Sequence, residues 1–293
     1  LSNVRVNRLI KEHDGDIEKI ALSREKNKKT AETEKAPKTE KTVEKTDIAV
    51  DEKESKSLEL DLEDKVSFEG IEIDHSITSL EIINAEKLTD ISALSSLNNL
   101  NELKFDYCEK LTDISALASL KNLNDLNLSK GELDEDQKIT DISALASLKN
   151  LNDLDLSWCG ELTDISALAS LKNLNELDLS GCGELKDISA LASLENLEKL
   201  SLSSCQELTD ISALASLKNL NDLDLSENQK LTDISALASL NNLKELGLNR
   251  CGDLTDISAL ASLENLNDLN LSSCEKLTDI SALASLKNLN ELD

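Results

Sequence analysis

The feature that most constrains this chain of 293 residues is a segment that occurs nine times in succession. Each copy opens on Leu or Ile and continues with a close variant of TDISAL. Successive copies are about 23 residues apart, except for one longer step, and such a period is typical of a solenoid. In a solenoid each copy is a structural unit that packs on its neighbours. The opening residues are Leu88, Leu111, Ile139, Leu162, Leu185, Leu208, Leu231, Leu254 and Leu277.

One copy, residues 174–196, predicts the local structure of all the others. Leu177 and Leu179 alternate with polar residues, which is the period of a strand with one buried face. From Leu185 and Ile188 onward, apolar residues recur every three positions, the period of a 3₁₀ helix. We therefore expect an α/β solenoid of about ten repeats, with a parallel concave β-sheet and a 3₁₀ or irregular convex side.

The pattern LxxLxLxxCxxLxDIxxLxxLxN in this copy resembles the leucine-rich-repeat signature. The run LTDISALASLKNLNELDLS at 162–180 resembles bacterial internalin-type repeats and, more distantly, phosphatase-regulating leucine-rich-repeat proteins. Two features depart from the internalin pattern: Ala93 and its equivalents replace a usual Pro, and the repeats are one residue longer, with a cysteine in six of them. The resemblance covers residues 77–293. It implies a leucine-rich-repeat fold and a binding role, either as an interaction module or as a bacterial surface adhesin or stalk whose repeats set length.

Composition and repeats together divide the chain into three parts. Residues 23–57 alternate Lys, Glu and Thr with few apolar residues, so we expect residues 1–65 to be disordered apart from a short helix at 16–26. Residues 66–87 are expected to form an N-terminal cap and a degenerate first repeat. Residues 88–293 are expected to form nine leucine-rich repeats, the last of them truncated.

The net charge limits the partners of the repeats. Of the total of −27, only −2 belongs to residues 1–65, and −25 belongs to the rest. Nucleic acid and anionic membranes are poor partners for such a surface, because affinity for phosphate comes mainly from Lys and Arg. No run of about 20 apolar residues is present to span a bilayer. We therefore expect another protein as the partner, with a basic surface, and no nucleic acid and no membrane insertion.

Outward-facing strand positions form two acidic columns that are candidates for binding. One hypothesis is that these columns hold a basic partner on the concave face. The equally weighted alternative is that like charges keep an otherwise adhesive sheet soluble. The candidate partner-binding residues in these columns are Asp153, Asp155, Glu176, Asp178, Asp222 and Asp224.

The single longer repeat marks a second candidate site. Its insertion begins near Lys130 and includes Glu132 and Asp134, which we expect to form an exposed acidic turn. The repeats on either side carry the only Tyr and the only Trp of the chain, Tyr107 and Trp158. An aromatic pair beside a polar loop is typical of a binding hot spot. The alternative is drift within a duplicated array.

All six cysteines occupy the same repeat position, and Asn228 takes it in one copy. This exchange indicates a structural ladder in which a small polar side chain bonds backbone in the turn. Metal binding would require CxxC pairs or nearby His, and the cysteines have neither. Free thiols favour a reducing compartment, so we expect a cytoplasmic location. The ladder residues are Cys108, Cys159, Cys182, Cys205, Asn228, Cys251 and Cys274.

Two further invariant columns have structural interpretations. The Asp of each TDIS copy, Asp90 through Asp279, is expected to cap the N–H groups of a tight helical turn. The Asn that ends each copy, Asn99 through Asn288, is expected to be a turn residue with left-handed backbone. No His or Lys is placed to activate a Ser, and no glycine-rich phosphate loop is present, so we expect no enzyme, no catalytic residue and no cofactor.

Overall fold

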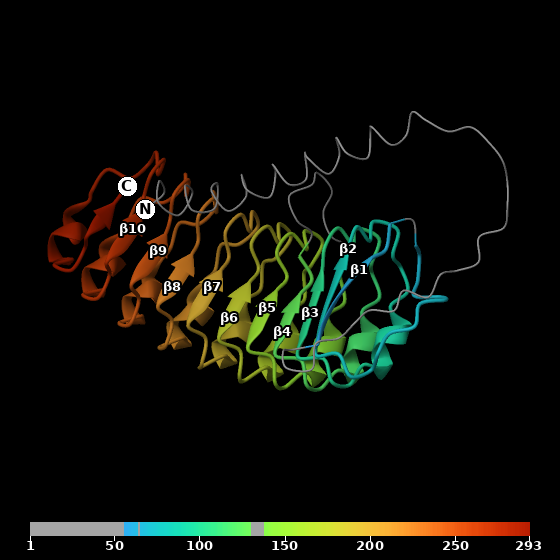
Figure 1. Ribbon diagram of the computed structural model, residues 1–293. Helices are drawn as coiled ribbons and strands as arrows, with labels where there is room; N and C mark the ends of the chain where they lie inside the picture. Colours follow the sequence, from blue (N-terminus) through green and yellow to red (C-terminus); the bar gives the residue numbers. More distant parts are fainter. Residues whose placement is uncertain (1–55, 64, 130–137) are drawn as a thin grey trace, which may run out of the picture. The chain divides into compact units, whose positions relative to one another are not determined.

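The computed structural model describes residues 56–63, 65–129 and 138–293, all within the unit Lys53–Asp293. Figure 1 shows their strands side by side in one parallel sheet of eleven strands, in the order of the sequence. The strands are β1 (Ser57–Asp61), β2 (Ser79–Ile83), β3 (Glu102–Phe105), β4 (Asp125–Asn127), β5 (Asp153–Asp155), β6 (Glu176–Asp178), β7 (Lys199–Ser201), β8 (Asp222–Asp224), β9 (Glu245–Gly247), β10 (Asp268–Asn270) and β11 (Glu291–Leu292).

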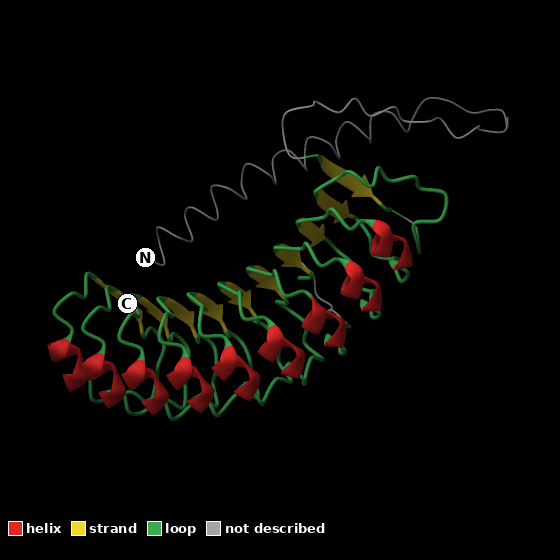
Figure 2. Cartoon of the chain, turned by 90° about the horizontal axis from the view of Figure 1, so that it is seen from below, coloured by secondary structure: helices red, strands yellow, loops and turns green. Residues whose placement is uncertain are grey.

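A row of 3₁₀ helices lies opposite the sheet, so the strands line the inner side of the array and the helices its outer side (Figure 2). Each helix covers the five residues SALAS, or SALSS in the first. These helices are η1 (Ser92–Ser96), η2 (Ser115–Ser119), η3 (Ser143–Ser147), η4 (Ser166–Ser170), η5 (Ser189–Ser193), η6 (Ser212–Ser216), η7 (Ser235–Ser239), η8 (Ser258–Ser262) and η9 (Ser281–Ser285). The predicted leucine-rich-repeat solenoid, with its parallel sheet and 3₁₀ side, is confirmed.

The sheet forms because equal repeat lengths place equivalent leucines beside one another. Leu154 of β5 pairs with Leu177 of β6, which pairs in turn with Leu200 of β7. All three are almost completely buried between the sheet and the helices. No single repeat could bury these side chains, so each coil depends on its neighbours for its core.

The outer side turns tightly because its apolar residues recur every three positions. The N–H of Leu168 donates to the carbonyl of Ile165, and the N–H of Leu171 donates to that of Leu168, which are the bonds of a 3₁₀ helix. The preceding aspartate holds the entry to the helix, as its position predicts: Asp164 Oδ1 accepts the N–H of Ser166 at 2.8 Å. The same bond recurs in the other described repeats, for example between Asp210 and Ser212.

The asparagine column has a different role from the predicted one. In the described residues the left-handed positions do not include this column. Instead each side-chain amide reaches back one repeat: Asn173 Nδ2 donates to the carbonyl of Lys149 at 2.9 Å, and Asn196 Nδ2 donates to that of Lys172 at 2.8 Å. The column is therefore a ladder that joins adjacent coils, and the prediction of a left-handed turn was wrong.

The array begins earlier than the sequence analysis expects. Strand β1 lies within residues 1–65, which were predicted to be disordered, and pairs with β2 along five residues. The reason is an alternation inside a charged stretch: Leu58 and Leu60 pack against the core, while Glu59 between them and Asp61 after them are exposed. In the segment expected to form the degenerate first repeat, Leu80 and Ile82 of β2 are completely buried. The expected helix at 16–26 lies outside the described residues.

The cysteine position lies inside the array, at the turn after each strand. Cys182 Sγ donates to the carbonyl of Leu156 at 3.5 Å, and Cys205 Sγ donates to that of Leu179 at 3.3 Å. Asn228 makes the corresponding bond to Leu202 and a second one to Leu225, at 2.9 and 2.8 Å. All six cysteines are free and buried, so this column joins coils through the interior.

The burial of the cysteines predicts a graded reactivity. Burial raises the pKa of Cys108, Cys205 and Cys251 to about 12, so the reactive thiolate is scarce at neutral pH. Cys274, next to the C-terminal coil, is 9% exposed, whereas the other five are 0% exposed. We expect Ellman's reagent to label Cys274 first and the other five thiols only on unfolding. Rapid labelling of all six in native buffer would contradict the buried ladder.

Candidate functional site

The concave face presents two columns of outward side chains in strict register. Each column joins equivalent residues of neighbouring strands, which lie about 4.8 Å apart in a sheet. We call them the first and second concave columns. The first column is Glu102, Asp125, Asp153, Glu176, Lys199, Asp222, Glu245, Asp268 and Glu291. The second column is Lys104, Asn127, Asp155, Asp178, Ser201, Asp224, Gly247 and Asn270.

Carboxylates of the first column stand on three adjacent strands around β5. Partial burial, together with the neighbouring Asp125, Glu176 and Asp155, raises the pKa of Asp153 to about 6, against a smaller opposing effect of Lys199. Burial likewise raises the pKa of Asp125. These carboxylates therefore carry their charge at neutral pH at a cost in stability, which a nearby cation would reduce.

The lysine of the first column, Lys199, already forms an ion pair within the column. Lys199 Nζ lies 2.5 Å from Glu176 Oε1 of the preceding strand, and the bond raises the pKa of the lysine. Lys104 forms a similar pair with Glu102 at 2.6 Å. Between these pairs lie three carboxylates of the two columns, Asp125, Asp153 and Asp155.

The second column has a structural role that the sequence analysis missed. Asp155 Oδ1 accepts the N–H of Ser157 at 2.8 Å, and Asp178 Oδ1 accepts that of Ser180 at 2.7 Å. Asp224 makes the same bond to Ser226 at 2.9 Å. These bonds hold the turns that follow β5, β6 and β8, as the TDIS aspartates hold the entry to each helix. The shared spacing of Asp, any residue and Ser was visible in the sequence.

The two aromatic residues share one position at the edge of this face. Tyr107 and Trp158 each precede the cysteine of their repeat and have left-handed backbone, with φ of 56° and 61°. Tyr107 is partly buried, and Trp158 is 47% exposed. The insertion between them, with Lys130, Glu132 and Asp134, lies outside the described residues. The structure therefore gives both aromatic residues the same left-handed turn position after their strands and leaves the predicted acidic turn undescribed.

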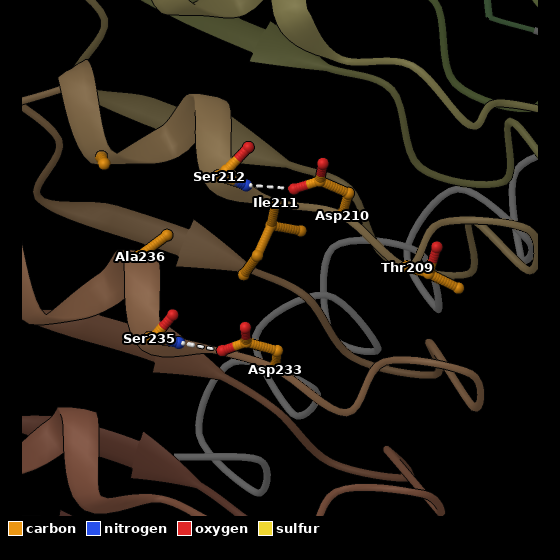
Figure 3. A pocket seen from close by; sticks show the side chains of 8 residues that line it. Thr209, Asp210, Ile211, Ser212, Asp233, Ser235 and Ala236 are labelled. Atoms are coloured by element: carbon orange, nitrogen blue, oxygen red, sulfur yellow. Dashed lines mark hydrogen bonds between the residues drawn. The ribbon is translucent and has the colours of Figure 1, made fainter.

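Grooves also lie between adjacent repeats. One of them, of about 460 Å³, is lined by the TDIS segments of two successive repeats (Figure 3). Its carboxylates, Asp210 and Asp233, accept the N–H groups of Ser212 and Ser235, and these bonds lower the pKa of both aspartates. Such groups stay ionised at neutral pH and are poorly suited to general acid chemistry. Equivalent grooves recur along the array, which indicates packing geometry rather than one specialised pocket.

The described residues contain no group of three or more His, Cys, Asp or Glu side chains arranged to hold a metal ion. In the same residues, no helix is both long and apolar enough to cross a membrane.

Comparison with known proteins identifies the family. Residues 54–206 match a family model described as plant disease resistance protein RPS2-like, leucine-rich repeats, and residues 195–239 and 241–285 match one described as leucine rich repeats in two copies. This chain belongs to the leucine-rich-repeat family. No curated protein sequence matches it.

Solved structures place these leucine-rich repeats near the internalins. Internalin C2 of Listeria monocytogenes is 32% identical, with 71% of this chain and 88% of that chain covered and a TM-score of 0.59. Internalin F of the same species is 28% identical, with 81% and 86% covered and a TM-score of 0.44. The leucine-rich repeat domain of the type III effector XopL is 21% identical, with 81% and 75% covered and a TM-score of 0.50. The leucine-rich repeats are internalin-like, and such repeats generally serve as protein-interaction modules.

The opposite pKa shifts of the two kinds of aspartate predict how stability depends on pH. Asp153 has a folded pKa of about 6, above its ordinary 3.8, so its contribution to stability grows as pH falls from 7 and protonation relieves the crowding. The pKa of the capping Asp187 is lowered by the N–H of Ser189, so its contribution is present above 3.8 and is lost as pH falls further. Stability should therefore rise from pH 7 to about 4.5 and then fall.

Urea unfolding at several pH values measures this profile. Asp153→Asn should flatten the rise between pH 7 and about 4.5, because the crowded carboxylate is gone. Asp187→Ala should lower stability at pH 7 and leave that rise in place. A wild-type profile that falls steadily from pH 7 downward would contradict the crowding of the first column.

Proposed function

We propose that this leucine-rich-repeat chain is a non-catalytic interaction module that binds a protein with a basic surface through its acidic concave face. The observation that carries the proposal is the in-register column of carboxylates on β4, β5 and β6. Two unit charges about 5 Å apart repel by roughly 0.8 kcal/mol even at the dielectric of water. A basic partner relieves that repulsion along several strands at once.

The raised pKa of Asp153 supports binding over mere solubility. A column that served only solubility needs exposed charges, whereas Asp125 and Asp153 are partly buried and carry their charge at a cost. A partner cation beside Asp153 would lower its pKa again and release a fraction of a proton on binding. Tyr107 and Trp158 are proposed to border the bound partner at the edge of the face.

The negative charge of the repeats also limits the kinds of partner that they can bind. The balance of −25 over residues 66–293 argues against nucleic acid and anionic membranes as partners. The six free, buried thiols support a reducing compartment, and we propose the cytoplasm on that ground.

A second candidate function is a bacterial surface adhesin or stalk in which the repeats mainly set length. Its support is the uninterrupted sheet of nearly identical coils and the similarity to internalin C2. Under this alternative the side chains of the concave columns would be exchangeable, so the same experiment separates the two functions.

The test measures binding of a fluorescent, acetylated peptide in which Arg alternates with Ser. The concave triple variant Asp153→Asn, Asp155→Asn and Asp178→Asn should weaken binding about tenfold, with each lost ion pair contributing about 0.5 kcal/mol.

The matched control removes three charges from the opposite flank, in the capping aspartates Asp164→Asn, Asp187→Asn and Asp210→Asn. These residues are exposed in the structure and lie outside the concave columns. The control should change affinity by less than about twofold. Equal weakening by both triple variants would mean that net charge alone attracts the peptide, and would overturn a binding site on the concave face.

A further inference from the structure

The indole of Trp158 is held in a fixed place by the neighbouring repeat. The backbone N–H of Trp158 donates to the carbonyl of Ser180 at 2.7 Å, which anchors the left-handed residue to the next coil. Left-handed backbone costs a large side chain roughly 1 kcal/mol relative to glycine. The described array has a tryptophan at such a position nonetheless, and strain of this kind is commonly found at binding sites.

Gly181 occupies the equivalent position one repeat further on, with φ of 72°. A Cβ atom on Gly181 would lie 2.6 Å from Cε3 and 2.7 Å from Cδ2 of Trp158. Because Cδ2 is the fused, interior atom of the ring system, it can be approached this closely only through the face of the indole. One face of the ring therefore lies against the backbone of Gly181.

The other side of the indole is open. Trp158 keeps 47% of its surface exposed although its first face is covered. Among the described left-handed positions of this column, only Gly181 is a glycine. Trp158 thus presents one exposed face of its indole. Gly181 lies against the other face, and glycine is the residue type that lets the ring lie flat on the backbone.

Two carboxylates are bonded to the backbone of the turns that carry Trp158 and Gly181. Asp155 accepts the N–H of Ser157, the residue before Trp158. Asp178 accepts the N–H of Ser180, whose carbonyl in turn accepts the N–H of Trp158. Indole is the aromatic side chain that binds cations best, and nearby negative charge strengthens that preference.

We propose that the exposed face of Trp158 is a platform for a guanidinium or ammonium group of the partner, held between Asp155 and Asp178. The proposal rests on the proposed function, because it specifies which side chain of a basic partner is bound and where. Gly181 acts as a positioning residue that keeps the ring flat.

The single tryptophan of the chain provides the readout, since its fluorescence reports only this site. The probes are the alternating Arg and Ser peptide and the same peptide with citrulline, an uncharged residue of the same shape, in place of Arg. The arginine peptide should change the fluorescence of the wild-type protein, and the citrulline peptide should change it far less. Equal responses to both would mean stacking without charge recognition and would overturn a cation site.

Substitutions then test the platform by affinity for the labelled arginine peptide. Trp158→Ala should weaken binding about five- to thirtyfold, and Trp158→Phe should weaken it less. Gly181→Ala should also weaken it, because the new Cβ displaces the ring. Ser273→Ala, at the same position in a distant repeat, is the matched control and should have no effect. Thermal melts of each variant check that the fold is retained.

The outcomes separate the two proposals. If the concave triple variant loses binding while Trp158→Ala retains wild-type affinity, the acidic face binds the partner and the platform is refuted. If the arginine peptide binds neither the wild-type protein nor any variant, both proposals fail. Loss in Trp158→Ala and Gly181→Ala, with an unchanged Ser273→Ala, supports the platform.

Discussion

Every part of this structure depends on the pairing of each coil with the equivalent residues of the next coil. The backbone bond from the N–H of Asn175 to the carbonyl of Asn152 recurs from repeat to repeat, and it holds neighbouring strands in register. A single coil is too small to bury Leu177 or Leu191 alone. The core is therefore shared between coils, and any residue that alters the register would affect the whole array.

The same register divides the residues into those that must be uniform and those that can vary. Positions that hold a coil together or join it to a neighbouring coil are nearly invariant: the leucines, the interior cysteine column, the capping aspartates and the asparagine ladder. Positions that face solvent on the strands and at the left-handed edge carry different side chains, such as Lys199 among carboxylates or Trp158 beside Gly181. Specific recognition is possible only at these variable positions, because only they distinguish one repeat from another.

Much of the fold could be predicted because its signals are local and repeated. The two-residue and three-residue spacings within one copy indicate the strand and the 3₁₀ helix, and nine copies remove the ambiguity. The asparagine ladder could not be predicted from the spacing within one copy, because Asn173 donates to the carbonyl of Lys149, which belongs to another coil. Strand β1 was missed for a related reason: its two leucines look isolated in a charged stretch until β2 is placed beside them.

The site was predictable in outline and not in detail. Alternation along the strands places Asp153 and Glu176 on the open face, and in-register stacking makes them neighbours. The contact between Trp158 and Gly181 depends on the direction of a side chain from one repeat to the next, which no local pattern gives. The residues that precede the cysteines form one column in the sequence. Within that column Gly181 is the only glycine, and it comes one repeat after Trp158.

The most direct test of this account is amide hydrogen exchange with and without the arginine peptide. Because a bound partner slows local opening beneath it, exchange should slow in β5, β6 and the turns that follow them, around Trp158 and Gly181. Exchange in η4 and η5, on the outer side, should not change. Slowing confined to the outer helices, or no slowing at a peptide concentration that saturates binding, would contradict a partner site on the concave face.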